Sequence, residues 1–261
     1  MSSTTTVQGG SRAATLAELL QRARQAVVLT GAGVSVPSGI PDFRTPGTGL
    51  WENVNPMEVA HINAFRGDPD RFWRFYSERF VSLRDKRPNR AHVLIAELER
   101  RELVRGVITQ NVDRLHRLAG SQNVIEVHGS IEWSVCLECG GRVRLAEVIE
   151  MVEARAATDG FAAPECVACV VPLKPDVVLF GELLPETAMS AAHALAAEAD
   201  LILCVGSSLE VFPVAGLPEV CRVAGGQIAL VTQGPTPYDS QAAVKLDGDV
   251  VAELEAVVAA L

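Results

Sequence analysis

The sequence is short of basic residues and has no long apolar run. Its 261 residues hold 23 Lys and Arg against 32 Asp and Glu, a formal net charge of −9. This balance argues against non-specific nucleic-acid binding, which needs clustered basic side chains. Apolar runs such as Leu201–Val205 are far too short to cross a bilayer. Residues 1–11 have neither a basic segment nor an apolar core, so we expect no signal peptide and a cytoplasmic protein.

Cysteines are also few, and four of the six form two C-x-x-C pairs. The pairs are Cys136 with Cys139 and Cys166 with Cys169. In a cytoplasmic chain this spacing favours a metal over disulfides, the alternative being reduced thiols without metal. Four thiolates suit tetrahedral zinc and leave no open coordination position, so we expect one structural zinc ion. Cys204 and Cys221 lie in apolar surroundings and are expected in the core.

Short β-rich runs alternate with helical patterns along most of the chain. The runs are 26–30, 106–109, 124–127, 176–180, 201–205 and 227–231, and the helical patterns include 13–24, 91–103 and 186–199. Strands that alternate with helices form βαβ units. The pattern therefore predicts an α/β fold with a mainly parallel sheet and helices on both faces.

Two segments interrupt this alternation. Residues 45–85 begin with a Gly/Pro-rich loop and continue into an aromatic helix, and residues 134–171 hold the cysteine pairs around a helical stretch. We expect both to be insertions that together form a smaller domain. The sheet domain then comprises 13–44, 86–133 and 172–261, after a polar tail, 1–12, that we expect to be disordered.

The segment LTGAGVSVPSGIPDFR, residues 29–44, lacks the third glycine of the usual dinucleotide loop. Gly31 and Gly33 permit a sharp turn close to a phosphate, and a following helix start would add N–H donors. Two glycines are also typical of an ordinary tight turn. Ser35 keeps the segment polar, and the tail at 42–44 adds an acid, a ring and a cation. These additions favour a nucleotide site.

Polar side chains follow the next two predicted strands as well. Gln110, Asn111 and Asp113 crowd the end of one strand, where ligands bind in open α/β sheets. An Asn at this position can instead cap the next helix, but three such groups exceed what a cap requires. His128 follows the other strand and is either a general base or a structural histidine. We expect His116 on a helix surface.

Two later motifs complete the set. DVVLFGE, residues 176–182, is expected to be a strand whose end pairs with an extended peptide. GSSLEVFP, residues 206–213, is a polar turn after a buried strand and could hydrogen-bond a ribose or a phosphate.

In order and spacing these motifs resemble those of the sirtuin family, and most closely its bacterial members. The similarity runs from about residue 26 to residue 251. It implies a Rossmann-like domain and a small zinc domain, with NAD and an acyl-lysine peptide meeting in the cleft between them. The implied activity is NAD-dependent protein-lysine deacylation, which yields nicotinamide, O-acyl-ADP-ribose and free lysine.

The resemblance also implies roles for individual residues. His128 would take a proton from a ribose hydroxyl, and Asn111 would act at the nicotinamide end. The implied NAD contacts are Gly31, Ala32, Gly33, Ser35, Asp42, Phe43, Arg44, Gln110, Asn111, Asp113, Gly206, Ser207, Ser208, Thr232 and Val250. The implied peptide contacts are Val178, Phe180, Gly181 and Glu182. Thr232 stands where the family commonly has an Asn, so the contacts to the adenosine ribose are expected to differ.

Tyr76 and Arg79 raise the question of acyl choice. The pair resembles the one with which desuccinylating and demalonylating sirtuins grip an acyl carboxylate. Residues three apart share a helix face, so both could reach an acyl group. The alternative is a solvated helix face with Tyr76 packed into the core of the small domain.

Three rival functions explain less of the sequence. An NAD-dependent oxidoreductase would share the sheet and the first glycines but needs neither the tail at 42–44 nor the cysteine pairs. A zinc-ribbon adaptor would explain the cysteines alone. Protein ADP-ribosylation is a nearer alternative, because it differs from deacylation only after nicotinamide has left.

Overall fold

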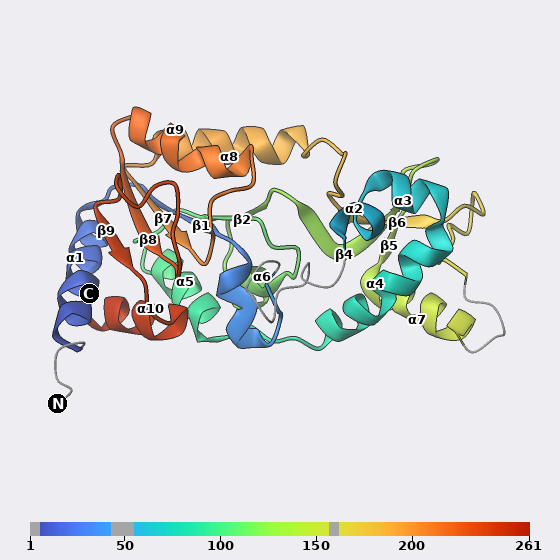
Figure 1. The fold of residues 1–261 in the computed structure, drawn as a ribbon, viewed down its shortest axis with the longest axis horizontal. Coiled ribbons are helices and arrows are strands. Elements are labelled where there is room, and N and C mark those ends of the chain that lie inside the picture. The colour runs from blue at the N-terminus through green and yellow to red at the C-terminus, as the bar shows by residue number, and fades with distance from the viewer. Residues whose placement is uncertain (1–5, 43–54, 157–161) are drawn as a thin grey trace.

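A computed structural model describes residues 6–42, 55–156 and 162–261 of the protein. Figure 1 shows two lobes side by side along the long axis. One lobe holds a six-stranded sheet and is called the sheet lobe. The other holds a three-stranded sheet with helices α2, α3, α4 and α7, and is called the small lobe. None of the described helices is long and apolar enough to cross a membrane.

The sheet of the larger lobe is parallel throughout, in the order β3-β2-β1-β7-β8-β9. The strands are β1 Ala26–Thr30, β2 Val107–Thr109, β3 Val124–Glu126, β7 Leu201–Val205, β8 Gln227–Val231 and β9 Val244–Leu246. Every residue of β1 and β7 is buried, as expected for a parallel sheet covered on both faces. The predicted α/β fold is confirmed.

Helices cover both faces of this sheet, because alternate residues of each strand point to opposite faces. Val28 of β1 packs with α1 Thr6–Arg22, α5 Arg90–Arg100 and α10 Val250–Ala259. Val27 and Leu29 pack with α8 Glu186–Glu198 and α9 Leu217–Val223 on the other side (Figure 1). The shorter helical pieces of this lobe are η1 Ala32–Ser38, α6 Leu115–Leu118 and η2 Val214–Gly216.

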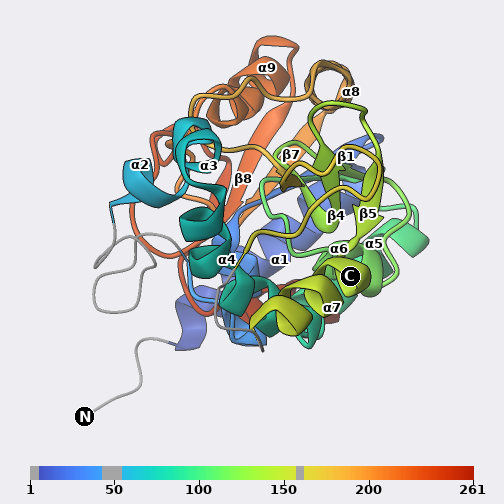
Figure 2. The same cartoon turned by 90° about the vertical axis from the view of Figure 1, so that its right-hand side faces the viewer.

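The small lobe has its own sheet and its own core. Its strands are antiparallel in the order β5-β4-β6, with β4 Gly129–Cys136, β5 Arg142–Arg144 and β6 Leu173–Val177. Its helices are α2 Pro56–Val59, α3 Ile62–Gly67, α4 Pro69–Arg84 and α7 Leu145–Ala156. Trp73 of α4 joins helix to sheet, since its indole N–H donates to the Leu173 carbonyl at 2.7 Å. Figure 2 shows these helices in front of the larger sheet.

The first helix differs from the sequence prediction. It begins at Thr6, within the tail 1–12 for which we expected disorder, while residues 1–5 lie outside the described part of the chain. Burial of Leu16 and Leu20 against the sheet holds the helix, and this tertiary packing overrides the low helix propensity of the glycines before them.

The predicted strand 176–180 also differs. The strand is Leu173–Val177, and it pairs with β4 in the small lobe rather than with the parallel sheet. The two cysteine pairs bring the chain back alongside β4, so the strand forms directly after the second pair. The predicted domain boundary between 133 and 134 consequently falls inside β4.

Candidate active site

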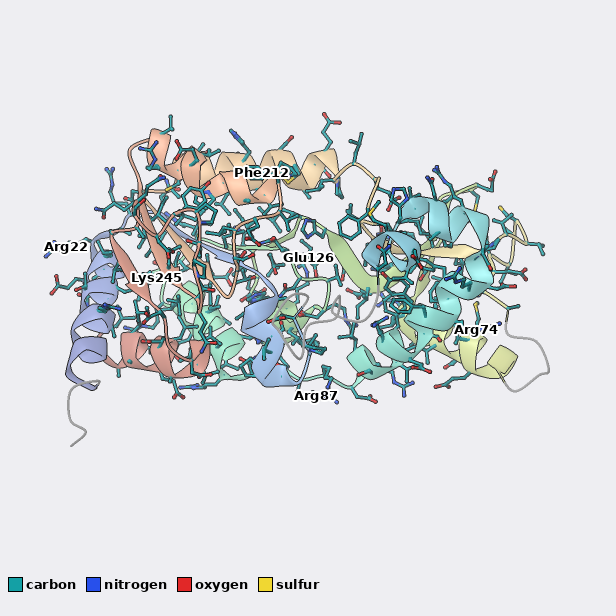
Figure 3. The ribbon with its side chains drawn as sticks, viewed as in Figure 1. Arg22, Arg74, Arg87, Glu126, Phe212 and Lys245 are labelled. Atoms are coloured by element: carbon teal, nitrogen blue, oxygen red, sulfur yellow. The ribbon has the colours of Figure 1, made fainter. Side chains whose placement is uncertain are left out.

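Most of the predicted polar residues meet at the carboxyl edge of β1, β2, β3 and β7. In Figure 3, Glu126, the last residue of β3, is labelled near the middle of the molecule, between the two lobes. Hydrogen bonds at this edge involve the side chains of Ser35, Gln110, Asn111, Asp113, His128 and Ser207. The structure therefore brings these predicted residues together at one edge of the sheet.

Gly31 and Gly33 bring the loop after β1 against the end of β7. Gly31 N–H donates to the Val205 carbonyl at 3.1 Å, and Gly33 N–H donates to the Gly206 carbonyl at 2.9 Å. A Cβ on either glycine would lie 2.8 Å from Gly206 atoms, and Gly206 itself has φ of 60°. The packing of the two loops therefore requires these glycines. This requirement is separate from the need for a phosphate to approach the backbone.

Ser35, Asn111 and Asp113 form a buried cluster behind this loop. Ser35 Oγ donates to Asp113 Oδ2 at 2.6 Å, and Asn111 Nδ2 donates to Ser35 Oγ at 3.1 Å and to the Gly31 carbonyl at 3.0 Å. Asp113 Oδ1 accepts the N–H of Leu115, the first residue of α6, at 2.9 Å, so Asp113 rather than Asn111 bonds the start of this helix. Burial raises the pKa of Asp113, and its hydrogen bond from Ser35 lowers that pKa in part.

His128 is oriented by a backbone group of the neighbouring strand end. Its Nδ1 lies 2.9 Å from the Gln110 carbonyl oxygen. Since a carbonyl oxygen can only accept, Nδ1 carries the proton and Nε2 of the neutral ring is left as an acceptor. Burial lowers the pKa of His128 below 6.5, so the ring is neutral at neutral pH and able to accept a proton.

The remaining predicted nucleotide residues lie farther along the same edge. Ser207 is buried and its Oγ accepts from Gln110 Nε2 at 2.9 Å, whereas Ser208 Oγ donates to exposed Glu210 at 3.2 Å. Thr232 follows β8, and Val250 opens α10. Asp42, another predicted contact, is the last residue described before a gap, and the predicted Phe43 and Arg44 lie outside the described residues.

Two buried histidines beneath the site were not predicted. His116, expected on a helix surface, is 2% exposed, and its Nε2 lies 2.9 Å from Thr30 Oγ1. The His92 ring meets it edge-on with centroids 4.9 Å apart. Burial lowers the pKa of His92 to about 4 and that of His116 to about 3. The position of His92 among the apolar residues of its helix was the one sequence signal of its burial.

The four predicted cysteine ligands form a compact group. All four Sγ atoms lie within 4.8 Å of one another, and the Cys139 and Cys166 sulfurs are 3.8 Å apart. Zinc–sulfur bonds of about 2.3 Å in a tetrahedron place the sulfurs about 3.8 Å apart, so the thiols fit this ion. Hydrogen bonds within this group lower the pKa of Cys136 to about 7 and raise that of Cys169 to about 12, so the four thiols titrate together.

The predicted peptide residues follow β6. Val178 N–H donates to the His128 carbonyl at 2.8 Å, so this segment runs beside the candidate base. Phe180 N–H donates to the Ala60 carbonyl and its own carbonyl accepts from Ile62 N–H, both at 2.9 Å. The Phe180 ring is 46% exposed. Glu182, by contrast, is bonded to this chain through its carboxylate.

Tyr76 and Arg79 lie on α4. The Tyr76 ring stacks between those of Phe72 and Phe80, with centroids 4.5 and 5.5 Å away, and burial raises its pKa to about 12. The Arg79 guanidinium carbon lies 3.8 Å from the Phe75 ring centroid, and burial lowers its pKa. Tyr76 therefore packs in the small-lobe core, and Arg79 is partly withdrawn from solvent.

Comparison with known proteins identifies the family. Residues 31–213 match the Sir2 family, and the chain belongs to it. It is 42% identical to the NAD-dependent protein deacetylase of Thermotoga maritima over 234 residues, which cover 90% of this chain and 92% of the relative. It is 44% identical to the NAD-dependent protein deacylase of Thermus thermophilus over 232 residues, covering 87% of this chain and 86% of the relative.

Solved structures agree with this assignment. A complex of Sir2 with a p53 peptide and NAD+ matches with a TM-score of 0.85 and 40% identity. Sir2Tm bound to a propionylated peptide matches with a TM-score of 0.84 and 39% identity. In both cases the match covers 94% of this chain and 96% of the solved chain. The predicted resemblance to sirtuins is thus confirmed over nearly the whole fold.

Proposed function

We propose that this protein is an NAD-dependent protein-lysine deacylase. The observation that carries the proposal is the convergence of His128, Asn111 and Asp113 at the carboxyl edge of the parallel sheet, beside the junction with the small lobe. The similarity to deacetylases and deacylases, and to Sir2 chains solved with NAD+ and with acylated peptides, supports the same activity.

NAD acts as a co-substrate in this proposal: nicotinamide leaves, and the acyl group passes from lysine to ADP-ribose. The donors and acceptors of the edge suit such a ligand. Asn111 and Asp113 are buried and held by Ser35, so they would meet the nicotinamide end without rearranging first. Ser207, fixed by Gln110, and the loop glycines would meet ribose and phosphates.

His128 serves as the general base. The Gln110 carbonyl holds the Nδ1 proton and thereby presents Nε2 as the acceptor for a ribose hydroxyl proton. A ring with a pKa lowered by burial is uncharged at neutral pH, so it is ready to accept that proton. A general base of this kind contributes about 10²–10⁴-fold to the rate.

Zinc would have a structural role at the cysteine group. Four thiolates fill a tetrahedral coordination sphere, so the ion would have no free position for a substrate. Its site joins β4 to the segment before β6, and thereby secures the strand that precedes the peptide segment. Closely spaced thiols suited to a metal favour a reducing compartment, which is our reason for proposing a cytoplasmic location.

Acyl choice is a finer part of the proposal. A guanidinium that is partly desolvated binds a carboxylate more strongly than one in bulk water, and Arg79 is in this state beside Tyr76. We infer that Arg79 accepts a succinyl or malonyl carboxylate, so that desuccinylation or demalonylation accompanies deacetylation.

Incubation with NAD and a panel of acyl-lysine peptides, read by mass spectrometry, tests the function. We expect equal amounts of free lysine peptide, nicotinamide and O-acyl-ADP-ribose. ADP-ribosylated protein in place of these products would favour the transferase alternative. Reduced nicotinamide would favour an oxidoreductase, and a failure to bind NAD would contradict the proposal altogether.

A further inference from the structure

Lys174 is a buried cation beneath the peptide segment. It is the second residue of β6, and its side chain is 6% exposed. The ammonium donates to the Val177 carbonyl at 2.8 Å and to the Pro175 carbonyl at 3.1 Å, and it lies 2.9 Å from Glu182 Oε2. A buried ammonium needs such acceptors, and all three belong to the stretch 175–182.

Glu182 closes the same stretch from its other end. Its Oε2 also accepts the Leu179 N–H at 2.9 Å, while its own N–H donates to the Leu179 carbonyl at 3.0 Å. Gly181, inside this turn, has φ of 84°, and a Cβ there would lie 2.6 Å from the His61 ring. The turn therefore has one conformation, fixed by Glu182 and by the glycine.

This stretch is joined directly to the candidate base. Val178 N–H donates to the His128 carbonyl at 2.8 Å. A Cβ on Gly129, the next residue, would collide with the Asp176 carbonyl, so the two backbones are in close contact. A shift of the stretch would therefore move His128 as well as the exposed Phe180.

We propose that Lys174 and Glu182 are a positioning pair that holds Val178–Gly181 in the conformation that binds the acyl-lysine peptide. Glu182 acts through Lys174 and the Leu179 N–H, not by contact with the substrate. This assignment rests on the proposed deacylase function, and it replaces the sequence-based expectation that Glu182 contacts the peptide.

Lys174→Met tests the pair, because methionine keeps the length of the stem and removes the charge. We expect the KM for peptide to rise about ten- to a hundredfold, the scale on which misplaced groups lose activity. The KM for NAD should stay within about twofold of wild type. Lys174→Arg, which keeps the charge, should recover most of the loss.

Lys245→Met is the matched control. Lys245 also ties down a loop, donating to the Gly234 carbonyl at 2.6 Å and to Asp239 at 2.7 Å, but it does so in the sheet lobe (Figure 3). If Lys174→Met and Lys245→Met change the KM for peptide equally, the Lys174 effect comes from a general loss of stability. That result would overturn the proposal. Thermal unfolding of each variant shows which of them fold.

Glu182→Gln separates positioning from direct recognition, and it keeps the proposal testable if Lys174→Met fails to fold. It is assayed on two acyl-lysine peptides that differ by Arg or Ala beside the acyl-lysine. A positioning role predicts the same rise in KM, about tenfold, for both peptides. A loss confined to the Arg peptide would mean that Glu182 binds substrate, and would overturn the proposal.

The activity of the wild-type protein distinguishes a failure of the deacylase function from a failure of the positioning role. An inactive wild type on every acyl peptide overturns the deacylase function, and the positioning role falls with it. An active wild type whose Lys174→Met and Glu182→Gln variants match Lys245→Met overturns the positioning role alone.

Discussion

The two lobes are stabilised in different ways. The sheet lobe has a parallel sheet whose central strands β1 and β7 are wholly buried, with one apolar cluster on each face. The small lobe has three antiparallel strands and one cluster, in which Cys136 and Cys166 are themselves core residues. The cysteine group is thus part of the packing of the small lobe, whereas no comparable group occurs among the described residues of the sheet lobe.

This difference indicates where ligands affect stability. Burial of apolar surface on two faces can hold the sheet lobe without a bound ion. Small units with little core usually depend on a metal or another crosslink. The candidate active-site residues come from the sheet lobe and the proposed peptide segment from the small lobe, so the proposed activity depends on both lobes.

Removal of the metal should have the largest effect. A strong chelator or Cys136→Ser is expected to unfold the small lobe and abolish deacylation, because structural zinc contributes about 10–16 kcal/mol to folding. Hydrogen exchange should show loss of protection in β4 and β6 but not in β1 and β7. Cys221→Ser, a buried cysteine of the other lobe, is the control. Full activity in protein shown to contain no zinc would contradict the prediction.

The next largest effect is expected at the junction of the lobes. His128→Ala removes the proposed general base and should lower deacylation at least about 10²-fold. NAD binding, which we assign mainly to sheet-lobe groups, should be retained, as measured by calorimetry. His193→Ala, at an exposed histidine of α8, should behave as wild type. Near-normal turnover by the His128 variant would show that another group is the base.

Within the small lobe, Arg79→Met should change acyl choice rather than stability. Loss of a charge-assisted contact is expected to lower the succinyl-to-acetyl ratio of kcat/KM about ten- to a hundredfold. The measurement uses one peptide sequence with the two acyl groups. Arg71→Met, an exposed position of the same helix, is the control. If the ratio is the same in all three proteins, Arg79 does not contact the acyl group.

The last prediction concerns acid stability of the sheet lobe. The buried histidines have folded pKa values of about 4 and about 3, below the ordinary 6.5. Between pH 6.5 and these folded values, the unfolded chain binds protons at the two histidines and the folded chain does not. The free energy of unfolding therefore has its full histidine contribution above pH 6.5 and falls as the pH is lowered below it. The slope is at most about 1.4 kcal/mol per pH unit for each histidine.

His92→Gln tests this contribution, since glutamine does not titrate. Chemical unfolding between pH 6.5 and 4 should show a shallower slope for this variant than for wild type. His193→Gln, at an exposed position, is the control. Equal slopes in all three proteins would mean that other groups govern acid unfolding.

Much of the sheet lobe could be predicted because its signals are local. The predicted runs 26–30, 201–205 and 227–231 coincide with β1, β7 and β8, since strands buried on both faces read as unbroken apolar stretches. β9 has three residues, and β4 pairs with β6 with a shift in register, so neither gave a clear pattern.

The sequence could predict which residues lie at the candidate site better than it could predict the contacts between them. Side chains after strand ends could be placed at one edge of the sheet from the pattern alone. The bond between His116 and Thr30 joins residues 86 positions apart, and no local spacing predicts it. In the same way, the pairing of Glu182 with Lys174 exists only in the folded chain, and no local spacing predicts it.

The contact between the two glycine loops has a mechanical consequence. The chain after β1 and the chain after β7 are joined by two backbone hydrogen bonds and leave no room for a Cβ on Gly31, Gly33 or Gly206. Neither loop can shift by itself without breaking a bond or opening a void. We therefore expect the two loops to move together, so that adjustment to a nucleotide comes from other parts of the molecule.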